Sequence, residues 1–218
     1  MDSKMFIKST ESLGKGAKRR WKVIRHFIPS KTRWFFEGHP QLKGQLWSKE
    51  RKLIYDTIKT YKPSNCFEIG TWKGGGSTLF IAQALFENAK GILHTIEINK
   101  DFHDEVKDKY QTYLKHLMPH IEFYLGDYRE KFSEVINSID GIDFLFLDGP
   151  EDARETLNQY EFFSPYMKKG FVLMAHDWFT EKTKLVKPLI ENKDEWKIEM
   201  ILKQPYSPGF ALAIKNNS

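Results

Sequence analysis

A glycine-rich segment that follows a short apolar run constrains the fold of this chain more than any other feature. The apolar run covers residues 66–69, just after Pro63, and four glycines then lie within residues 70–76. An apolar run of this length between Pro and Gly is typical of a buried strand. Ser77 and Thr78 follow, with an apolar helical pattern behind them, so hydroxyl residues stand where a helix N-cap belongs. The segment therefore predicts strand, glycine turn and helix, which brings bare backbone N–H groups close to a ligand.

Two common phosphate ligands fit this turn poorly. A P-loop needs G-x-x-x-x-G-K-[ST], and no Lys precedes Ser77. The dinucleotide fingerprint G-x-G-x-x-G is also missing, because residues 71–73 after Gly70 are Thr-Trp-Lys. Glu68, two residues before Gly70, would repel a pyrophosphate. The same carboxylate would suit a cationic ligand, such as a sulfonium that carries an α-amino group.

Strand and helix patterns alternate along the rest of the chain. Strand-like segments lie at 66–69, 92–98, 121–125, 142–148, 171–175, 196–202 and 210–215. Helical patterns lie at 47–61, 77–88, 101–117, 129–139, 153–167 and 183–192. This alternation, closed by a pair of strands, predicts a doubly wound α/β sheet.

Acidic residues follow the predicted strands at the edge where ligands bind. In an open parallel sheet, ligands lie at the carboxyl ends of the strands. Glu97 ends the second strand, where a carboxylate can accept both hydroxyls of a ribose. Asp148 follows the fourth strand, and His176 and Asp177 follow the fifth. We expect Asp148, His176 and Asp177 to face one crevice.

The segment E-I-G-T-W-K-G-G-G-S-T, residues 68–78, resembles motif I of class I S-adenosylmethionine-dependent methyltransferases. It is most similar to the small-molecule O-methyltransferase branch, which includes catechol O-methyltransferase and bacterial sugar and antibiotic O-methyltransferases. The resemblance covers roughly residues 46–215. It implies a Rossmann-like sheet of seven mostly parallel strands with helices on both faces and a reversed last strand between strands five and six. One departure is that three glycines precede Ser77, where the family pattern has two.

The resemblance also implies S-adenosylmethionine as the cofactor. It places cofactor contacts at Glu68, Gly70, Thr71, Gly74, Gly76, Ser77, Glu97, Asp127 and Asp148. The acid at the end of strand two, Glu97, is expected to bind the ribose. Asp127 either faces the adenine amino group or N-caps the helix that follows it, and one side chain could serve both.

Methyl transfer to a hydroxyl needs that hydroxyl to lose its proton, and the sequence leaves two routes open. A divalent cation, Mg²⁺ or Mn²⁺, held by Asp148, His176 and Asp177 would lower the pKa of the hydroxyl. Metal-dependent relatives have an acid where this chain has His176, and imidazole suits Mn²⁺ better than Mg²⁺. Alternatively, His176 is the general base, with an ordinary pKa of ~6.5. A third reading is that His176 and Asp177 only fix the loop before Trp178.

Positive charge is concentrated at the N-terminus of the 218-residue chain. Residues 1–34 contain ten Lys or Arg and two Asp or Glu, a balance of +8, and the other 184 residues have a balance of −3, which gives the net +5. A slightly acidic body argues against a nucleic-acid groove. We divide the chain into a basic arm, 1–45, and a methyltransferase domain, 46–218.

The arm contains one candidate amphipathic helix, residues 18–28, with Trp21, Ile24 and Ile28 on one face. This helix packs on its own domain or on a second subunit of a homodimer, binds a membrane surface, or covers the substrate pocket. The aromatic residues 34–36 either line a pocket or fill the core. No apolar stretch is long enough for a transmembrane helix or resembles a signal core, so we expect neither. The single Cys66 excludes an internal disulfide and fits a reducing, cytoplasmic compartment.

These observations predict an S-adenosylmethionine-dependent O-methyltransferase that acts on a small hydroxylated molecule. Residues 20–47, 178–182 and 204–209 would form the walls of the acceptor pocket. None of these segments indicates which acceptor binds. The alternative is a catalytically silent methyltransferase-fold module that docks through its basic arm.

Overall fold

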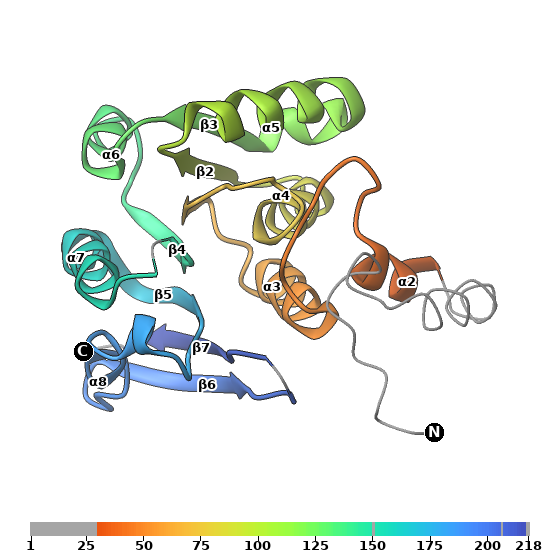
Figure 1. Cartoon of the computed structure of the whole chain (residues 1–218). Coiled ribbons are helices and arrows are strands. Elements are labelled where there is room, and N and C mark those ends of the chain that lie inside the picture. The colour runs from red at the N-terminus through yellow and green to blue at the C-terminus, as the bar shows by residue number, and fades with distance from the viewer. Residues whose placement is uncertain (1–29, 150, 206, 217–218) are drawn as a thin grey trace.

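The computed structural model describes residues 30–149, 151–205 and 207–216, and these form a seven-stranded sheet in the order β3-β2-β1-β4-β5-β7-β6 (Figure 1). The strands are β1 (Asn65–Ile69), β2 (Ile92–Glu97), β3 (Ile121–Leu125), β4 (Ile142–Leu147), β5 (Met167–His176), β6 (Trp196–Leu202) and β7 (Phe210–Lys215). The first five strands pair in parallel, and β7 lies antiparallel between β5 and β6. The predicted fold class, including the inserted reversed strand, is confirmed.

Helices cover both faces of the sheet (Figure 1). They are α2 (Ser30–Glu37), α3 (Ser48–Tyr61), α4 (Ser77–Asn88), α5 (Lys100–Tyr113), α6 (Tyr128–Ile136), α7 (Ala153–Phe163) and α8 (Lys187–Ile190), with 3-10 helices η3 (Lys115–His120), η4 (Ser164–Tyr166) and η5 (Glu181–Thr183). The core residues of α3, α4 and α5 form one apolar cluster, and those of α6, α7 and α8 form another. Strands between two such layers are buried on both faces, which explains why β1 and β4 are mostly apolar.

Several predicted helices are shorter than the pattern indicated, and a proline interrupts two of them. Helix α7 stops at Phe163 rather than at residue 167, because Pro165 has no N–H to continue the helical hydrogen bonds. Strand β5 consequently begins at Met167 instead of residue 171. The expected helix 183–192 is reduced to η5 and the short α8; Pro188 lies in the first turn of α8 and has no N–H to continue a helix that began before it. Likewise α5 stops at Tyr113, and the remainder of that predicted helix lies in η3.

The aromatic residues before α3 fill the core. Trp34 packs on Phe80 with ring centroids 4.3 Å apart, and Phe35 contacts both Phe80 and Tyr55. The predicted helix 18–28 lies outside the described residues, so its three proposed roles stay predictions. Among the described residues, every helix is too short or too polar to cross a bilayer.

The extra glycine of the turn between β1 and α4 has a steric cause. The segment before α3 crosses over the turn, and the Gly75 N–H donates a hydrogen bond of 2.9 Å to the Lys43 carbonyl. A Cβ added at Gly75 would lie 2.6 Å from that carbonyl oxygen, and one added at Gly44 would lie 2.2 Å from the Gly75 oxygen. Gly74 has a φ of +66°, and its carbonyl accepts a hydrogen bond of 2.7 Å from Tyr110. Only glycine permits this approach of two backbones.

Gly75→Ala should therefore lower the free energy of unfolding by about 1–3 kcal/mol, because the added methyl group forces the crossing segment away from the turn. Urea denaturation measures the change. Lys43→Ala is the matched control, since it leaves the backbone carbonyl in place and should change stability by less than about 0.5 kcal/mol. Equal stability of the Gly75→Ala variant and the wild type would contradict the close approach.

Candidate functional site

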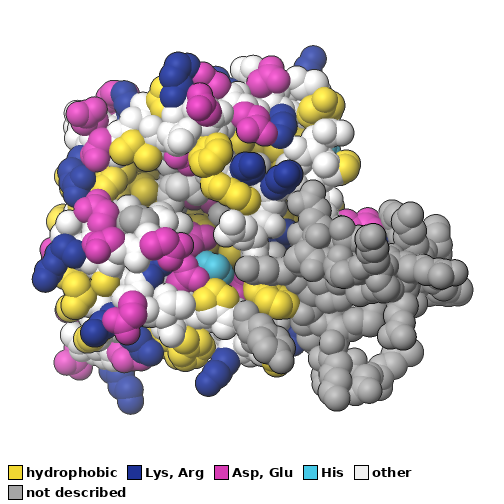
Figure 2. Space-filling model, in the orientation of Figure 1, with side chains coloured by type: hydrophobic (Ala, Val, Ile, Leu, Met, Phe, Trp, Pro, Cys, Tyr) yellow, Lys and Arg dark blue, Asp and Glu magenta, His cyan; other side chains and the backbone are white. Residues whose placement is uncertain are grey.

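A cavity of about 590 Å³ opens at the carboxyl edge of the sheet. Its walls come from the glycine turn, from the ends of β1, β2, β4 and β5, from residues 45–47 before α3, and from Pro208. In the space-filling view a histidine side chain lies recessed near the centre of the face shown, beside acidic side chains (Figure 2). The cavity therefore lies where an open parallel sheet binds its ligands.

Most of the residues that the sequence assigned to a cofactor line this cavity. They are Gly70, Thr71, Gly76, Ser77, Glu97, Asp127 and Asp148. Gly74, within the turn, and Glu68, in β1, are buried and do not line the cavity. The predicted segments 20–47 and 204–209 contribute residues 45–47 and Pro208 to the walls.

Glu68 connects the glycine turn to the sheet from below. Its Oε2 accepts hydrogen bonds from the hydroxyls of Thr78, at 2.6 Å, and Thr95, at 2.7 Å. Its Oε1 is buried without a hydrogen-bond partner among the described residues. Complete burial raises the pKa of Glu68 to about 7, although the hydroxyl donors oppose that rise. In the free protein, Glu68 is thus a carboxyl group that changes its protonation near neutral pH.

Glu97 lies at the end of β2 on the cavity wall and is held by two backbone donors. Its Oε2 accepts from the Trp72 N–H at 2.8 Å, and its Oε1 accepts from the Asn99 N–H at 2.9 Å. Trp72 has a φ of +48°, an uncommon conformation for a bulky residue, and this conformation accompanies the N–H contact to the carboxylate. The carboxylate position is fixed before any ligand binds.

Asp127 N-caps α6 and also lines the cavity. Its Oδ1 accepts a hydrogen bond of 2.8 Å from the Arg129 N–H, and its Oδ2 lies 3.2 Å from the Arg129 guanidinium. Each carboxylate oxygen can accept two hydrogen bonds, so Asp127 keeps capacity for a donor on a ligand beside these two contacts. The two expectations for Asp127 are compatible in this geometry.

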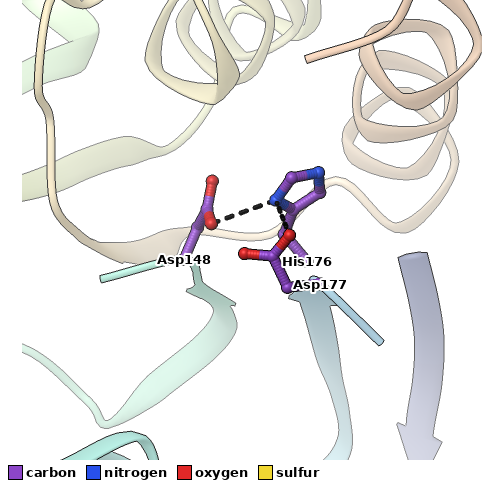
Figure 3. A group of neighbouring side chains, drawn as sticks. All are labelled: Asp148, His176 and Asp177. Atoms are coloured by element: carbon purple, nitrogen blue, oxygen red, sulfur yellow. Dashed lines mark hydrogen bonds and ion pairs between the residues drawn. The ribbon is translucent and has the colours of Figure 1, made fainter. Parts of the chain in front are cut away.

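Asp148, His176 and Asp177 come together as the strand ends predicted (Figure 3). The His176 Nδ1 lies 3.2 Å from the Asp148 Oδ1 and 3.3 Å from the Asp177 Oδ1. One ligand atom from each residue lies within 4.8 Å of the others, and all three residues line the cavity. Asp177 has a φ of +59°, in the left-handed region.

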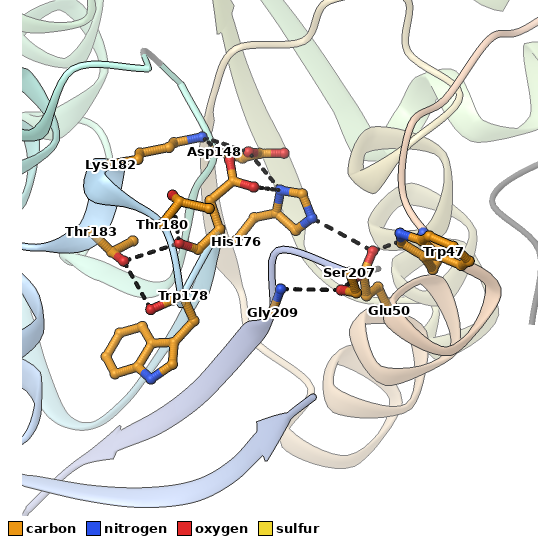
Figure 4. Close-up of polar contacts among 11 residues, drawn as sticks. Trp47, Glu50, Asp148, His176, Trp178, Thr180, Lys182, Thr183, Ser207 and Gly209 are labelled. Atoms are coloured by element: carbon orange, nitrogen blue, oxygen red, sulfur yellow. Dashed lines mark hydrogen bonds and ion pairs between the residues drawn. The ribbon is translucent and has the colours of Figure 1, made fainter. Parts of the chain in front are cut away.

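Two further charged residues, Glu50 and Lys182, complete this cluster, and sequence reasoning missed both (Figure 4). Glu50 is completely buried at the start of α3, and its Oε2 lies 3.6 Å from the His176 Nε2. The Glu50 Oε1 accepts a hydrogen bond of 2.6 Å from Ser207. The Lys182 Nζ donates to the Asp148 Oδ1 at 2.8 Å and to the Asp177 Oδ2 at 3.0 Å. The only sequence signal for Lys182 was its position five residues after Asp177.

The three carboxylates determine the protonation of His176. Burial opposes its positive charge, but Asp148, Asp177 and Glu50 outweigh burial and raise the pKa of His176 to about 12. The expected ordinary pKa near 6.5 is therefore wrong, and at neutral pH His176 is an imidazolium. Conversely, although burial alone would raise it, contacts with His176 and Lys182 lower the pKa of Asp177 to about 2.

Lys182 also determines whether a divalent cation fits these residues. Burial would lower the pKa of Lys182, but Asp148 and Asp177 raise it and keep the ammonium form. The side chain is only 2% exposed, and its nitrogen lies between the two carboxylates that would bind a cation. The donor set is suitable for a metal, but the space between the donors already contains a positive charge.

Comparisons with known proteins agree with this architecture. A family described as "Methyltransferase domain" matches residues 67–178. No curated protein matches the sequence significantly. Among solved structures, a putative caffeoyl-CoA O-methyltransferase from Staphylococcus aureus has a TM-score of 0.65 at 19% identity, covering 93% of this chain and 100% of that chain. The O-methyltransferase TomG from Streptomyces achromogenes, in complex with SAM, has a TM-score of 0.66 at 15% identity, covering 94% and 91%. An O-methyltransferase from Bacillus cereus in complex with SAH has a TM-score of 0.63 at 17% identity, covering 94% and 92%.

The raised pKa of Glu68 predicts a pH dependence of stability. A folded-state pKa of about 7 against 4.5 means that this stabilisation is complete below pH 4.5 and is lost as the pH rises through about 7. Between pH 5 and pH 8 the free energy of unfolding of the wild type should therefore fall by on the order of 2 kcal/mol more than that of Glu68→Gln. Urea denaturation at both pH values measures this, with the exposed Glu122→Gln as control. Identical pH profiles for Glu68→Gln and the wild type would show that Glu68 titrates normally.

Proposed function

This chain belongs to the methyltransferase domain family, and from that premise we propose that it transfers a methyl group from S-adenosylmethionine to a hydroxyl of a small molecule. One observation carries the proposal. The same cavity contains the Glu97 carboxylate and the glycine turn, which suit the cofactor, and the cluster of Asp148, His176 and Asp177. The proposed acceptor is a small hydroxylated compound, and its identity is left open.

The residues on the cavity wall fit S-adenosylmethionine. The Glu97 carboxylate is suited to accept the ribose hydroxyls, and Asp127 can accept from the adenine amino group. Gly70, Gly76 and Ser77 present the backbone of the turn and the start of α4 to the polar end of the cofactor. The partnerless, buried Glu68 Oε1 lies below this turn and favours a positively charged ligand nearby. When bound, the cofactor supplies a methyl group on a sulfonium, whose departure as a thioether needs no acid.

The chain itself must orient the acceptor hydroxyl and take its proton. His176 already has its proton at neutral pH, so it does not act as a base; it donates hydrogen bonds and positive charge beside the reacting oxygen. Asp177, with a pKa of about 2, holds a proton weakly, and we assign it to orienting the hydroxyl. Asp148 has the more exposed side chain, 24% against 12%, and we assign it to accepting the proton as the new O–C bond forms.

The proposal is tested by incubating the protein with S-adenosylmethionine and a panel of phenols, sugars and alcohols. The wild type should form S-adenosylhomocysteine only when an acceptor is present. Asp177→Asn should lower turnover by about 10²-fold, because the hydroxyl loses its orienting charge, while Asn tolerates the left-handed backbone. S-adenosylhomocysteine binding by the variant, measured by calorimetry, should be unchanged.

Two outcomes would contradict this assignment. Wild-type turnover in Asp177→Asn would remove Asp177 from the reaction. Cofactor binding with no acceptor-dependent turnover across the whole panel would favour the catalytically silent module.

Glu97→Ala should weaken the binding of S-adenosylhomocysteine by at least about tenfold, because the ribose loses hydrogen bonds to a charged acceptor. Isothermal titration calorimetry measures the affinity, and a thermal melt confirms that the variant folds. Glu122→Ala removes an acid from the other end of the sheet and should bind as the wild type does. Unchanged affinity in Glu97→Ala would place the ribose elsewhere.

A further inference from the structure

Lys182 reaches the charged cluster through a tightly hydrogen-bonded turn after β5. The Asp177 carbonyl accepts from the Thr180 N–H at 3.0 Å and from the Thr183 hydroxyl at 3.0 Å. The same Thr183 hydroxyl also lies 3.2 Å from the Trp178 carbonyl. These contacts fold the chain back at η5, so that the side chain five residues after Asp177 returns to the carboxylate (Figure 4).

The ammonium of Lys182 bridges the two carboxylates. Its nitrogen lies 2.8 Å from the Asp148 Oδ1 and 3.0 Å from the Asp177 Oδ2, which are ordinary distances for a charge-assisted hydrogen bond. A Mg²⁺ ion would need oxygen ligands at about 2.0–2.1 Å and several waters around it. A divalent cation and this ammonium therefore cannot both lie between Asp148 and Asp177.

The charge balance favours the lysine. Glu50, Asp148 and Asp177 supply three carboxylates, and His176 and Lys182 supply two cations. A divalent cation added to this set would meet two positive charges that are already buried. If Lys182 were removed, one cation would face three carboxylates, and a divalent ion would then be attracted strongly.

We propose that the Lys182 ammonium occupies the position between Asp148 and Asp177 that a divalent cation would need, and that it neutralises these two carboxylates in place of such a cation. The predicted Mg²⁺ or Mn²⁺ site at Asp148, His176 and Asp177 is thereby replaced by a cation that is part of the chain. Lys182 is a positioning residue, because it holds the two carboxylates rather than touching the reacting atoms.

The consequence for catalysis rests on the proposed function. A covalently attached ammonium cannot be removed by a chelator, so acceptor-dependent formation of S-adenosylhomocysteine should be the same with and without EDTA. It should also be the same after addition of Mg²⁺ or Mn²⁺.

Mn²⁺ binding tests the proposal without any acceptor. The signal of free Mn²⁺ in electron paramagnetic resonance falls when the ion binds, which gives the affinity directly. We expect the wild type to bind weakly and Lys182→Ala to bind at least about tenfold more tightly, because the substitution vacates the space and leaves excess negative charge. Lys184→Ala, which removes an exposed lysine two residues away, should behave as the wild type does. Adding Asp177→Asn to Lys182→Ala should abolish the new site.

Three outcomes would overturn the proposal. Tight Mn²⁺ binding by the wild type that disappears in Asp177→Asn would show a metal site beside Lys182. A folded Lys182→Ala variant with no gain in Mn²⁺ affinity would show that the ammonium was not what kept the ion out. If Lys182→Ala does not fold, the Mn²⁺ titration of the wild type still tests the proposal. Loss of turnover with EDTA would refute the proposed role of Lys182 and would still support methyl transfer. Absence of turnover under every condition would refute the proposed function alone.

Discussion

The parallel pairing of β1 with its neighbours, and of β4 with β5, is the constraint on which the whole site depends. Ile69 is paired with Ile96 on β2 and with Leu147 on β4, and Leu147 is paired with Ala175 on β5. The four strands therefore end in step. The residues that follow this row are Gly70, Glu97, Asp148 and His176. A single register thus places the glycine turn, the Glu97 carboxylate and the charged cluster on one edge of the sheet.

The residues at these strand ends could be predicted from the sequence because each strand end is marked by neighbouring residues. An apolar run that stops at a glycine or an acid marks a strand end, and parallel strands present their ends at one edge. The extra glycine is visible in the sequence, but its cause is not, because that cause is the backbone of Lys43, 32 residues before Gly75. Pro165 and Pro188 are also local signals, the first for the end of α7 and the second for the start of α8.

Glu50 and Lys182 could not be predicted, for a physical reason. Glu50 interacts with Ser207, 157 positions away, and with His176 through the packing of α3 beside β5 and β7. Lys182 interacts through a turn whose course depends on hydrogen bonds to main-chain carbonyls. Neither set of contacts produces a periodic pattern in the sequence. Glu50 adds to the rise in the pKa of His176, after Asp148 and Asp177, whose approach to His176 the predicted strand ends did indicate.

The charged cluster is stable only as a complete set. A buried ion pair often contributes little net stability, but removing one partner leaves an uncompensated charge that costs about 3–5 kcal/mol. Each ion here has at least two oppositely charged neighbours except Glu50, which has His176 and hydrogen bonds from Ser207 and the Trp47 N–H. Glu50 therefore connects the segment before α3, which forms part of the cavity wall, to the charged cluster at the end of β5.

Both the backbone and the carboxylate of Asp177 are held in place by their neighbours. Its left-handed φ of +59° is a conformation that costs energy in most residues, although Asp and Asn adopt it more readily. Hydrogen bonds from Thr180 and Thr183 to its carbonyl hold the backbone, while Lys182 and His176 hold the carboxylate. With both ends fixed, the carboxylate cannot rotate to follow a ligand. Under the proposed function an acceptor hydroxyl would come to the carboxylate, which is the preorganisation that in-line transfer to an oriented oxygen requires.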